Sequence, residues 1–142
     1  MRRGRILKST ILVLAFVGVG IQFVPVDKTN PPVVSALHAP APVDSILRRA
    51  CYDCHSHETR WPWYARVAPA SWFLARHVHR GRAELNFSDW PEFDFHQQDM
   101  DMREMWSEVK EGDMPRRSYL WIHRDARLSE QDRATLRRWL VE

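Results

Sequence analysis

The chain has 142 residues, 44% of them apolar or aromatic, which is enough for one domain with a modest core. Its net charge of +3 is unevenly distributed. Four of the 21 basic residues and none of the 18 acidic ones precede residue 27, which leaves 17 basic and 18 acidic side chains in the remainder. That remainder lacks the excess of basic residues that binding to DNA or RNA requires, so we expect no nucleic-acid partner.

The first predicted element is an apolar segment close to the N-terminus. Residues 9–26 carry no charge. Eighteen helical residues rise by about 27 Å, close to the hydrocarbon thickness of a membrane. The basic residues that precede them predict a cytoplasmic N-terminus; these are Arg2, Arg3, Arg5 and Lys8. We expect residues 1–26 to form a single-pass inner-membrane anchor, with a cleaved signal peptide as the alternative. Either way, the rest of the chain is exported to the periplasm.

A proline-rich segment follows the apolar one. Residues 27–42 contain four prolines, which fix φ and donate no backbone hydrogen bond. We therefore predict an extended linker there, and a folded domain over residues 43–142. In that domain the apolar residues recur at helical spacing, and no segment alternates as a strand does. The prediction is an all-α domain of about four helices.

Capping residues set the expected helix boundaries. We predict helices from near Val43 through the two cysteines, from Ser71 to about Arg80, over the segment that ends at Gly112, and from Ser129 to Leu140. Gly81 is the expected stop of the second helix. Ser129 followed by Asp132 predicts a capping box with aspartate in place of glutamate.

Residues 51–55, CYDCH, hold both cysteines of the chain and a histidine directly after them. Two thiols at this spacing occur in redox disulfides, zinc sites and covalent haem attachment. A redox pair usually lies at the start of a helix that follows a strand, and no strand is predicted before this helix. Zinc needs four ligands, and the other histidines form no good second pair. C-x-x-C-H is the attachment signature of c-type haem, and it uses both cysteines. We therefore predict one haem c bound through Cys51 and Cys54, with His55 as an axial ligand.

Met114 is the predicted second axial ligand. It lies in the sequence Gly112-Asp113-Met114-Pro115, in a predicted loop where proline stiffens the backbone. Two of the other methionines fit the apolar face of the third helix, where methionine usually fills the core. The alternatives that stay open are an uncoordinated distal side and the side chains of Met100, Met102, Met105, His77, His79, His96 and His123.

Three blocks of sequence carry a family resemblance. They are CYDCHSHETRWPWY (51–64), APASWFLARHVHRGRAELNFSDW (68–90) and GDMPRRSYLWIHRDARLSEQDRATLRRWL (112–140). In this order they resemble the bacterial haem-binding domain family, whose members are short exported proteins similar to cytochrome c. The resemblance covers residues 43–141. It implies that Cys51 and Cys54 attach the haem, and that His55 and Met114 are its proximal and distal ligands. His57 departs from the family pattern, in which asparagine is usual.

Together these features predict a membrane-tethered monohaem cytochrome c in which about four helices surround the haem. Because both axial positions of the iron would be filled, we expect single-electron transfer between unidentified redox proteins on the periplasmic side, rather than enzymatic chemistry. The alternatives are a haem peroxidase or haem-based sensor with an open or labile distal site, and a module that uses haem structurally. A further hypothesis is that aromatic residues either line the haem or pack in the core; these are Trp61, Trp63, Tyr64 and Trp72.

Overall fold

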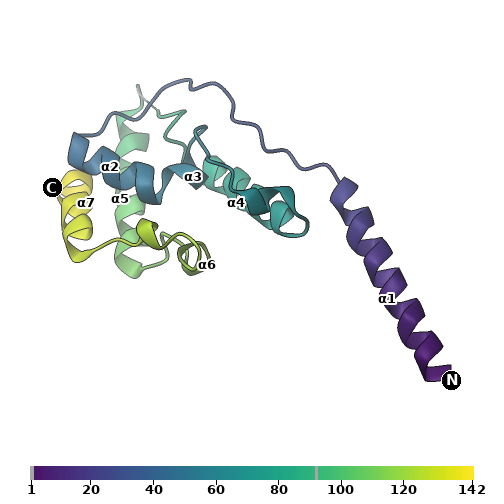
Figure 1. Ribbon diagram of the computed structural model, residues 1–142. Coiled ribbons are helices and arrows are strands. Elements are labelled where there is room, and N and C mark those ends of the chain that lie inside the picture. Colours follow the sequence, from purple (N-terminus) through teal and green to yellow (C-terminus); the bar gives the residue numbers. More distant parts are fainter. Residues whose placement is uncertain (1, 92) are drawn as a thin grey trace. The chain divides into compact units, whose positions relative to one another are not determined.

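The computed structural model describes residues 2–91 and 93–142, and over these residues its regular elements are all helical. The α-helices are α1 (Arg2–Gly20), α2 (Ala41–Ala50), α3 (Tyr52–His55), α4 (Ala70–Glu84), α5 (Phe95–Glu111), α6 (Arg117–Leu120) and α7 (Glu130–Val141) (Figure 1). Short 3₁₀ turns occur at Ile21–Phe23, Trp63–Arg66 and Arg124–Ala126. The predicted all-α class is confirmed.

The chain divides into two compact units. The N-terminal unit contains the first 29 residues together with Trp61–His77. The main unit contains Asn30–Arg60 together with Val78–Glu142. The C-x-x-C-H motif and Met114 both belong to the main unit.

In the N-terminal unit, α1 and the 3₁₀ turn after it form one long apolar element. Ile6–Phe23 has a mean hydropathy of 2.0, and none of this window is buried inside the protein. A core helix of a soluble protein would be mostly covered by other residues, so this exposure argues against that interpretation. Length and composition fit a membrane span or a signal sequence.

The same unit contains a segment rich in aromatic residues, Trp61–His77. The indole N–H groups of Trp61 and Trp72 are buried and have no hydrogen-bond partner among the described residues. Trp63 packs edge-on against Tyr64, with ring centroids 5.8 Å apart. Its side chain is nevertheless 77% exposed. Trp63 therefore does not pack in a core, and whether the other aromatic residues line the haem stays a prediction.

The core of the main unit lies among α2, α5 and α7. Helix α7 packs against both α5 and α2 (Figure 1). Leu47 on α2 and Leu136 on α7 are each 1% exposed, so these two helices bury the apolar faces that their periodicity predicts. The buried cluster consists of Leu37, Val43, Ile46, Leu47, Tyr52, Phe87, Trp90, Met105, Val109, Leu136 and Leu140.

The second half of the proline-rich segment pairs with the loop after α4. The amides of Val34 and Ser35 donate to the carbonyl of Ser88 at 2.9 and 3.2 Å. The amide of Leu37 donates to the carbonyl of Phe87 at 2.8 Å, and its side chain is buried. These long-range backbone bonds fix this part of the segment in an extended conformation against the core.

Two of the predicted caps are present. Gly112 ends α5 in the left-handed conformation, with φ of 82°. The Ser129 hydroxyl accepts from the Asp132 amide at 3.1 Å, and the Asp132 carboxylate accepts from the Ser129 amide at 2.8 Å, so the capping box of α7 is confirmed. Helix α5 begins at Phe95, where the side chain of Asp94 caps it by accepting from the amide of Gln97.

The expected boundaries of α4 are wrong at both ends. Ser71 does not cap the helix, because α4 already begins at Ala70. The backbone amide of Ser71 donates to the carbonyl of Val67 at 2.9 Å. Gly81 does not stop it, because α4 continues to Glu84. A Cβ at Gly81 would lie 2.6 Å from the carbonyl oxygen of Cys54. The glycine is therefore required because the backbones of α4 and α3 meet there, and not because the helix ends.

We predict that Gly81→Ala destabilises the fold. Helix propensity alone would raise the free energy of unfolding by about 1 kcal/mol. The added methyl group meets a backbone carbonyl that cannot rotate away, and overpacking of this kind costs about 1–3 kcal/mol. The net change should be a loss, measurable by denaturant unfolding of the full chain in detergent.

Arg80→Ala is the matched control, because Arg80 is the exposed neighbour of Gly81 on the same helix. It should change the free energy of unfolding by less than about 0.5 kcal/mol. A Gly81→Ala protein that is as stable as the Arg80→Ala protein, or more so, would contradict the close contact between α4 and α3.

Candidate haem-attachment site

The C-x-x-C-H motif forms a single helical turn. Helix α2 ends at Ala50, Cys51 is its C-cap, and α3 begins directly after it. The carbonyl of Cys51 accepts from the amides of Cys54 and His55, at 3.1 and 3.0 Å. Residues three apart on a helical turn lie on the same side, so the local fold brings the two cysteines to one face.

The imidazole of His55 is oriented by a backbone carbonyl. Its Nδ1–H donates to the carbonyl oxygen of Leu85 at 3.1 Å. Burial lowers the pKa of His55, although hydrogen bonding to the backbone at Leu85 and Gly81 opposes this effect. The ring is therefore neutral near pH 7, and the lone pair lies on Nε2. A neutral imidazole whose other nitrogen is bonded to a carbonyl is the usual form of a histidine metal ligand.

The two thiols are half-buried and free. Burial raises the pKa of Cys51 to about 12 and that of Cys54 to about 11, and the charges of Cys54 and Asp53, respectively, add to these shifts. Both cysteines are therefore protonated near pH 7. A redox pair needs at least one stabilised thiolate, so the environment of these thiols does not favour disulfide exchange.

The end of α4 and the loop after it bind the residues that follow the C-x-x-C-H motif. Arg82 donates from Nε to the carbonyl of Ser56 at 2.8 Å, and from a terminal nitrogen to the hydroxyl of Thr59 at 2.9 Å. The Asn86 amide nitrogen lies 2.8 Å from Nε2 of His57. His57 is thus occupied by structural contacts. Sequence reasoning assigned no role to Arg82 or Asn86, although both lie in the second block of the resemblance.

Asp53, between the two cysteines, links the motif to α6. Its carboxylate accepts from the hydroxyl of Tyr119 at 3.0 Å, from the amide of Arg60 at 3.1 Å and from Nε of Arg60 at 3.4 Å. Burial and the charge of Asp53 raise the pKa of Tyr119, so the phenol stays protonated and remains a donor. The Asp53–Tyr119 hydrogen bond brings the segment that follows Met114 to the C-x-x-C-H motif.

Met114 lies in the short connection between α5 and α6. After the left-handed Gly112, the amides of Asp113 and Met114 donate to the carbonyl of Glu108 at 3.0 and 3.2 Å. Met114 is half-buried and Pro115 is buried. The loop predicted around Met114 is thus an ordered turn, and the one-turn helix α6 follows it. The role of Met114 as a ligand stays a prediction.

The alternative ligands lie in other environments. Met105 is part of the core cluster and Met102 packs against it, as the apolar face of α5 predicts. Met100 is 49% exposed. His77 is exposed, with Nδ1 2.6 Å from the carbonyl of Phe73, and His79 and His96 are also exposed. His123 stacks on Tyr119, with ring centroids 4.2 Å apart.

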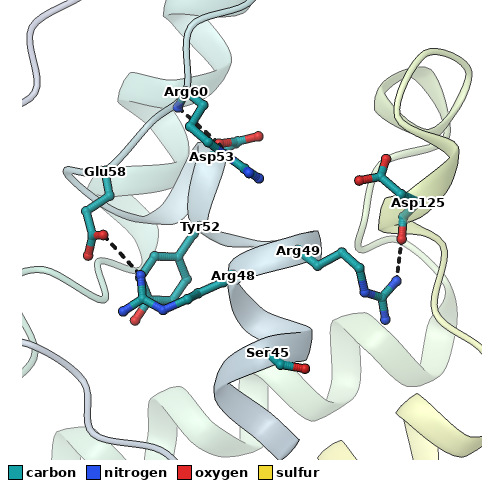
Figure 2. Close-up of a pocket in the computed structure, with 8 residues that line it drawn as sticks. All are labelled: Ser45, Arg48, Arg49, Tyr52, Asp53, Glu58, Arg60 and Asp125. Carbon is teal, nitrogen blue, oxygen red and sulfur yellow. Dashed lines mark hydrogen bonds and ion pairs between the residues drawn. The ribbon is translucent and has the colours of Figure 1, made fainter. Parts of the chain in front are cut away.

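A pocket of about 420 Å³ lies beside the motif (Figure 2). Its lining consists of Ser45, Arg48, Arg49, Tyr52, Asp53, Glu58, Arg60 and Asp125. Arg48 lies over the Tyr52 ring and pairs with Asp44 and Glu58 at 3.0 Å each. Arg49 pairs with Asp132 at 3.0 Å. The pocket's arginines are already bonded to carboxylates, so we assign it no ligand.

The donor set fits a covalently attached haem better than a zinc ion. Within residues 2–91 and 93–142, no three His, Cys, Asp or Glu side chains are grouped so that they could hold a metal ion. A haem needs fewer protein ligands: two thiols for its vinyl groups and one neutral imidazole nitrogen for the iron. Cys51, Cys54 and Nε2 of His55 supply these groups within one turn.

Comparison with known proteins also indicates a haem-binding protein. A family model described as a haem-binding domain matches residues 16–142. No curated protein and no solved structure matches the chain. The family match includes the motif, the whole main unit and the last part of the apolar N-terminal segment. Because it covers most of the chain, the protein belongs to the haem-binding domain family.

Proposed function

We propose that the protein is a membrane-tethered monohaem cytochrome c that transfers single electrons on the periplasmic side of the inner membrane. The observation that carries this proposal is the orientation of His55, whose Nδ1–H bond to Leu85 directs the lone pair to Nε2 within a C-x-x-C-H turn. Cys51 and Cys54 would hold one haem c covalently. His55 and Met114 would be the axial ligands.

When bound, the haem supplies an iron atom that gains or loses one electron. Residues of the chain hold the His55 imidazole in a fixed orientation and a fixed environment. The carbonyl of Leu85 fixes the rotation of the His55 ring and increases the basicity of Nε2. Phe87, 1% exposed, lies with its ring centroid 6.1 Å from that of His55 and shields the imidazole from water. A low-dielectric surrounding of this kind tunes the reduction potential of an attached haem.

The membrane tether is supported by α1 and the turn after it. The window Ile6–Phe23 is apolar, none of it is buried inside the protein, and basic residues cluster at its N-terminal end. An exposed apolar surface of this length requires lipid to cover it, and the basic residues favour a cytoplasmic N-terminus. The haem domain would then lie in the periplasm, where its redox partners are proteins still to be identified.

Covalent attachment is tested by mass spectrometry of the intact protein produced in cells that mature c-type cytochromes. We expect the native chain to gain the mass of one haem and to leave no thiol for alkylation. In the double variant Cys51→Ala, Cys54→Ala, acidified organic solvent should extract any haem from the protein. Haem that can be extracted from the native chain would contradict attachment through thioethers.

The second axial ligand is tested by the near-infrared spectrum of the oxidised protein. A thioether bound to iron(III) gives a charge-transfer band there, and Met114→Ala should abolish this band. Met100→Ala is the matched control, because Met100 is half-exposed and should leave the band unchanged. If the band survives Met114→Ala, another residue is the ligand. High-spin iron in the native protein would instead favour an open distal site.

A further inference from the structure

The aromatic segment of the N-terminal unit is fastened to the end of the apolar helix. The side-chain amide of Gln22 donates to the carbonyl of Ala68 at 3.2 Å and accepts from the amide of Ala68 at 2.9 Å. Five residues after the span, the ammonium of Lys28 donates to the carbonyl of Ala65 at 3.0 Å. Three hydrogen bonds therefore hold the backbone of Ala65–Ala68 beside the last turn of the span.

The position of Gln22 sets the depth of this segment. The span Ile6–Phe23 has 18 residues, which as a helix cover about 27 Å, nearly the whole hydrocarbon thickness of about 30 Å. Gln22 is its penultimate residue and so lies at the level of the headgroups on the far side. Because Ala68 is bonded to Gln22, the aromatic segment lies at that level too.

The exposed side chains of the segment suit this location. Trp63 is 77% exposed, Phe73 is 62% exposed and Val67 is 45% exposed. Large aromatic residues are enriched where a protein crosses the membrane–water interface, and tryptophan in particular stabilises that position. In water, by contrast, exposing three apolar side chains within eleven residues of sequence is unfavourable.

The charges of the segment also favour lipid. Trp61–His77 contains no acidic residue, whereas Arg66 and Arg76 are both basic and exposed. Arg76 lies three residues after Phe73 on α4, so the two side chains share one face of the helix. Cations next to aromatic side chains match an anionic headgroup layer over an acyl boundary.

We infer that Trp63, Val67 and Phe73 form a second membrane contact, in which the aromatic segment inserts into the outer headgroup layer while Arg66 and Arg76 bind anionic lipid phosphates. The inference rests on the membrane tether proposed above. The partner of this surface is the lipid bilayer. The aromatic segment would therefore be held against the membrane surface, and α1 would not be its only attachment to the membrane.

Photo-crosslinking of the full chain in phosphatidylcholine and phosphatidylglycerol vesicles tests this contact. Trp63 is replaced with p-benzoyl-phenylalanine, the vesicles are irradiated, and lipid adducts are measured by mass spectrometry. The same substitution at Trp121 is the matched control, because Trp121 belongs to the main unit and is 76% exposed. Substitution at Phe16, which is 81% exposed on α1, reports whether the helix itself is in the bilayer.

We expect abundant lipid adducts at positions 16 and 63, and severalfold fewer at position 121. Adducts at position 16 without adducts at position 63 would overturn the second contact and leave the tether intact. Equal yields at positions 63 and 121 would also overturn it, because the probe would then report only its own affinity for lipid. A lack of adducts at position 16 would overturn the tether, and this inference with it.

Lipid charge provides a separate readout. Adding phosphatidylglycerol to phosphatidylcholine should raise the yield at position 63 severalfold, and the double variant Arg66→Gln, Arg76→Gln should abolish that increase. A yield that does not depend on phosphatidylglycerol would overturn the assignment of the two arginines to anionic lipid.

Discussion

The contact between the last turn of α4 and the one-turn helix α3 is the constraint on which the candidate haem-attachment site depends. Gly81 allows the backbone of α4 to approach the carbonyl of Cys54, where any side chain would collide. Because α4 continues through Gly81, the amide of Leu85 bonds to the Gly81 carbonyl at 2.9 Å and the Leu85 carbonyl reaches His55. The Phe87 amide then donates to the His55 carbonyl at 2.7 Å. One glycine thus permits the hydrogen bonds that orient the imidazole of His55.

The segment that supports the site is in turn supported from outside α4. The loop that contains Phe87 and Ser88 accepts backbone bonds from the extended chain before α2, and Leu37 of that chain is buried in the core. The Ser88 hydroxyl also accepts from the His57 amide at 2.9 Å. The extended chain, the loop and the motif therefore stabilise one another. Displacing any one of them would leave backbone groups of the other two without partners, which is costly when they are buried.

The sequence predicts best those features that depend on neighbouring residues. The capping box at Ser129 and the left-handed Gly112 are local, and both are confirmed. The attachment motif is also local, because five consecutive residues define it. Features that depend on distant contacts were not predictable in the same way. A glycine at position 81 is a typical helix stop, yet α4 continues through it. Only its close approach to Cys54 explains why a glycine stands there.

The residues that fix the site illustrate the same limit. The carbonyl of Leu85 orients His55, and a backbone carbonyl has no sequence signal at all. Asp53 and Tyr119 are 66 residues apart, and neither belongs to a pattern that predicts their bond. The extended chain before α2 could be recognised as non-helical from its prolines. Its pairing with the loop after α4 could not, because proline content carries no information about a partner.

The Asp53–Tyr119 bond gives a physical reason why a distal ligand on the α5–α6 connection would hold its place. At one end of this connection, Gly112 adopts the left-handed conformation. The backbone amides of Asp113 and Met114 donate hydrogen bonds to the carbonyl of Glu108 in the last turn of α5. At the other end, Tyr119 binds the carboxylate between the two cysteines. A thioether carried between two fixed points would move little when the charge of a bound iron changes. If Met114 binds the iron as proposed, small ligand movement would lower the reorganisation that accompanies electron transfer, which fits the proposed electron carrier better than a site that must open to admit a substrate.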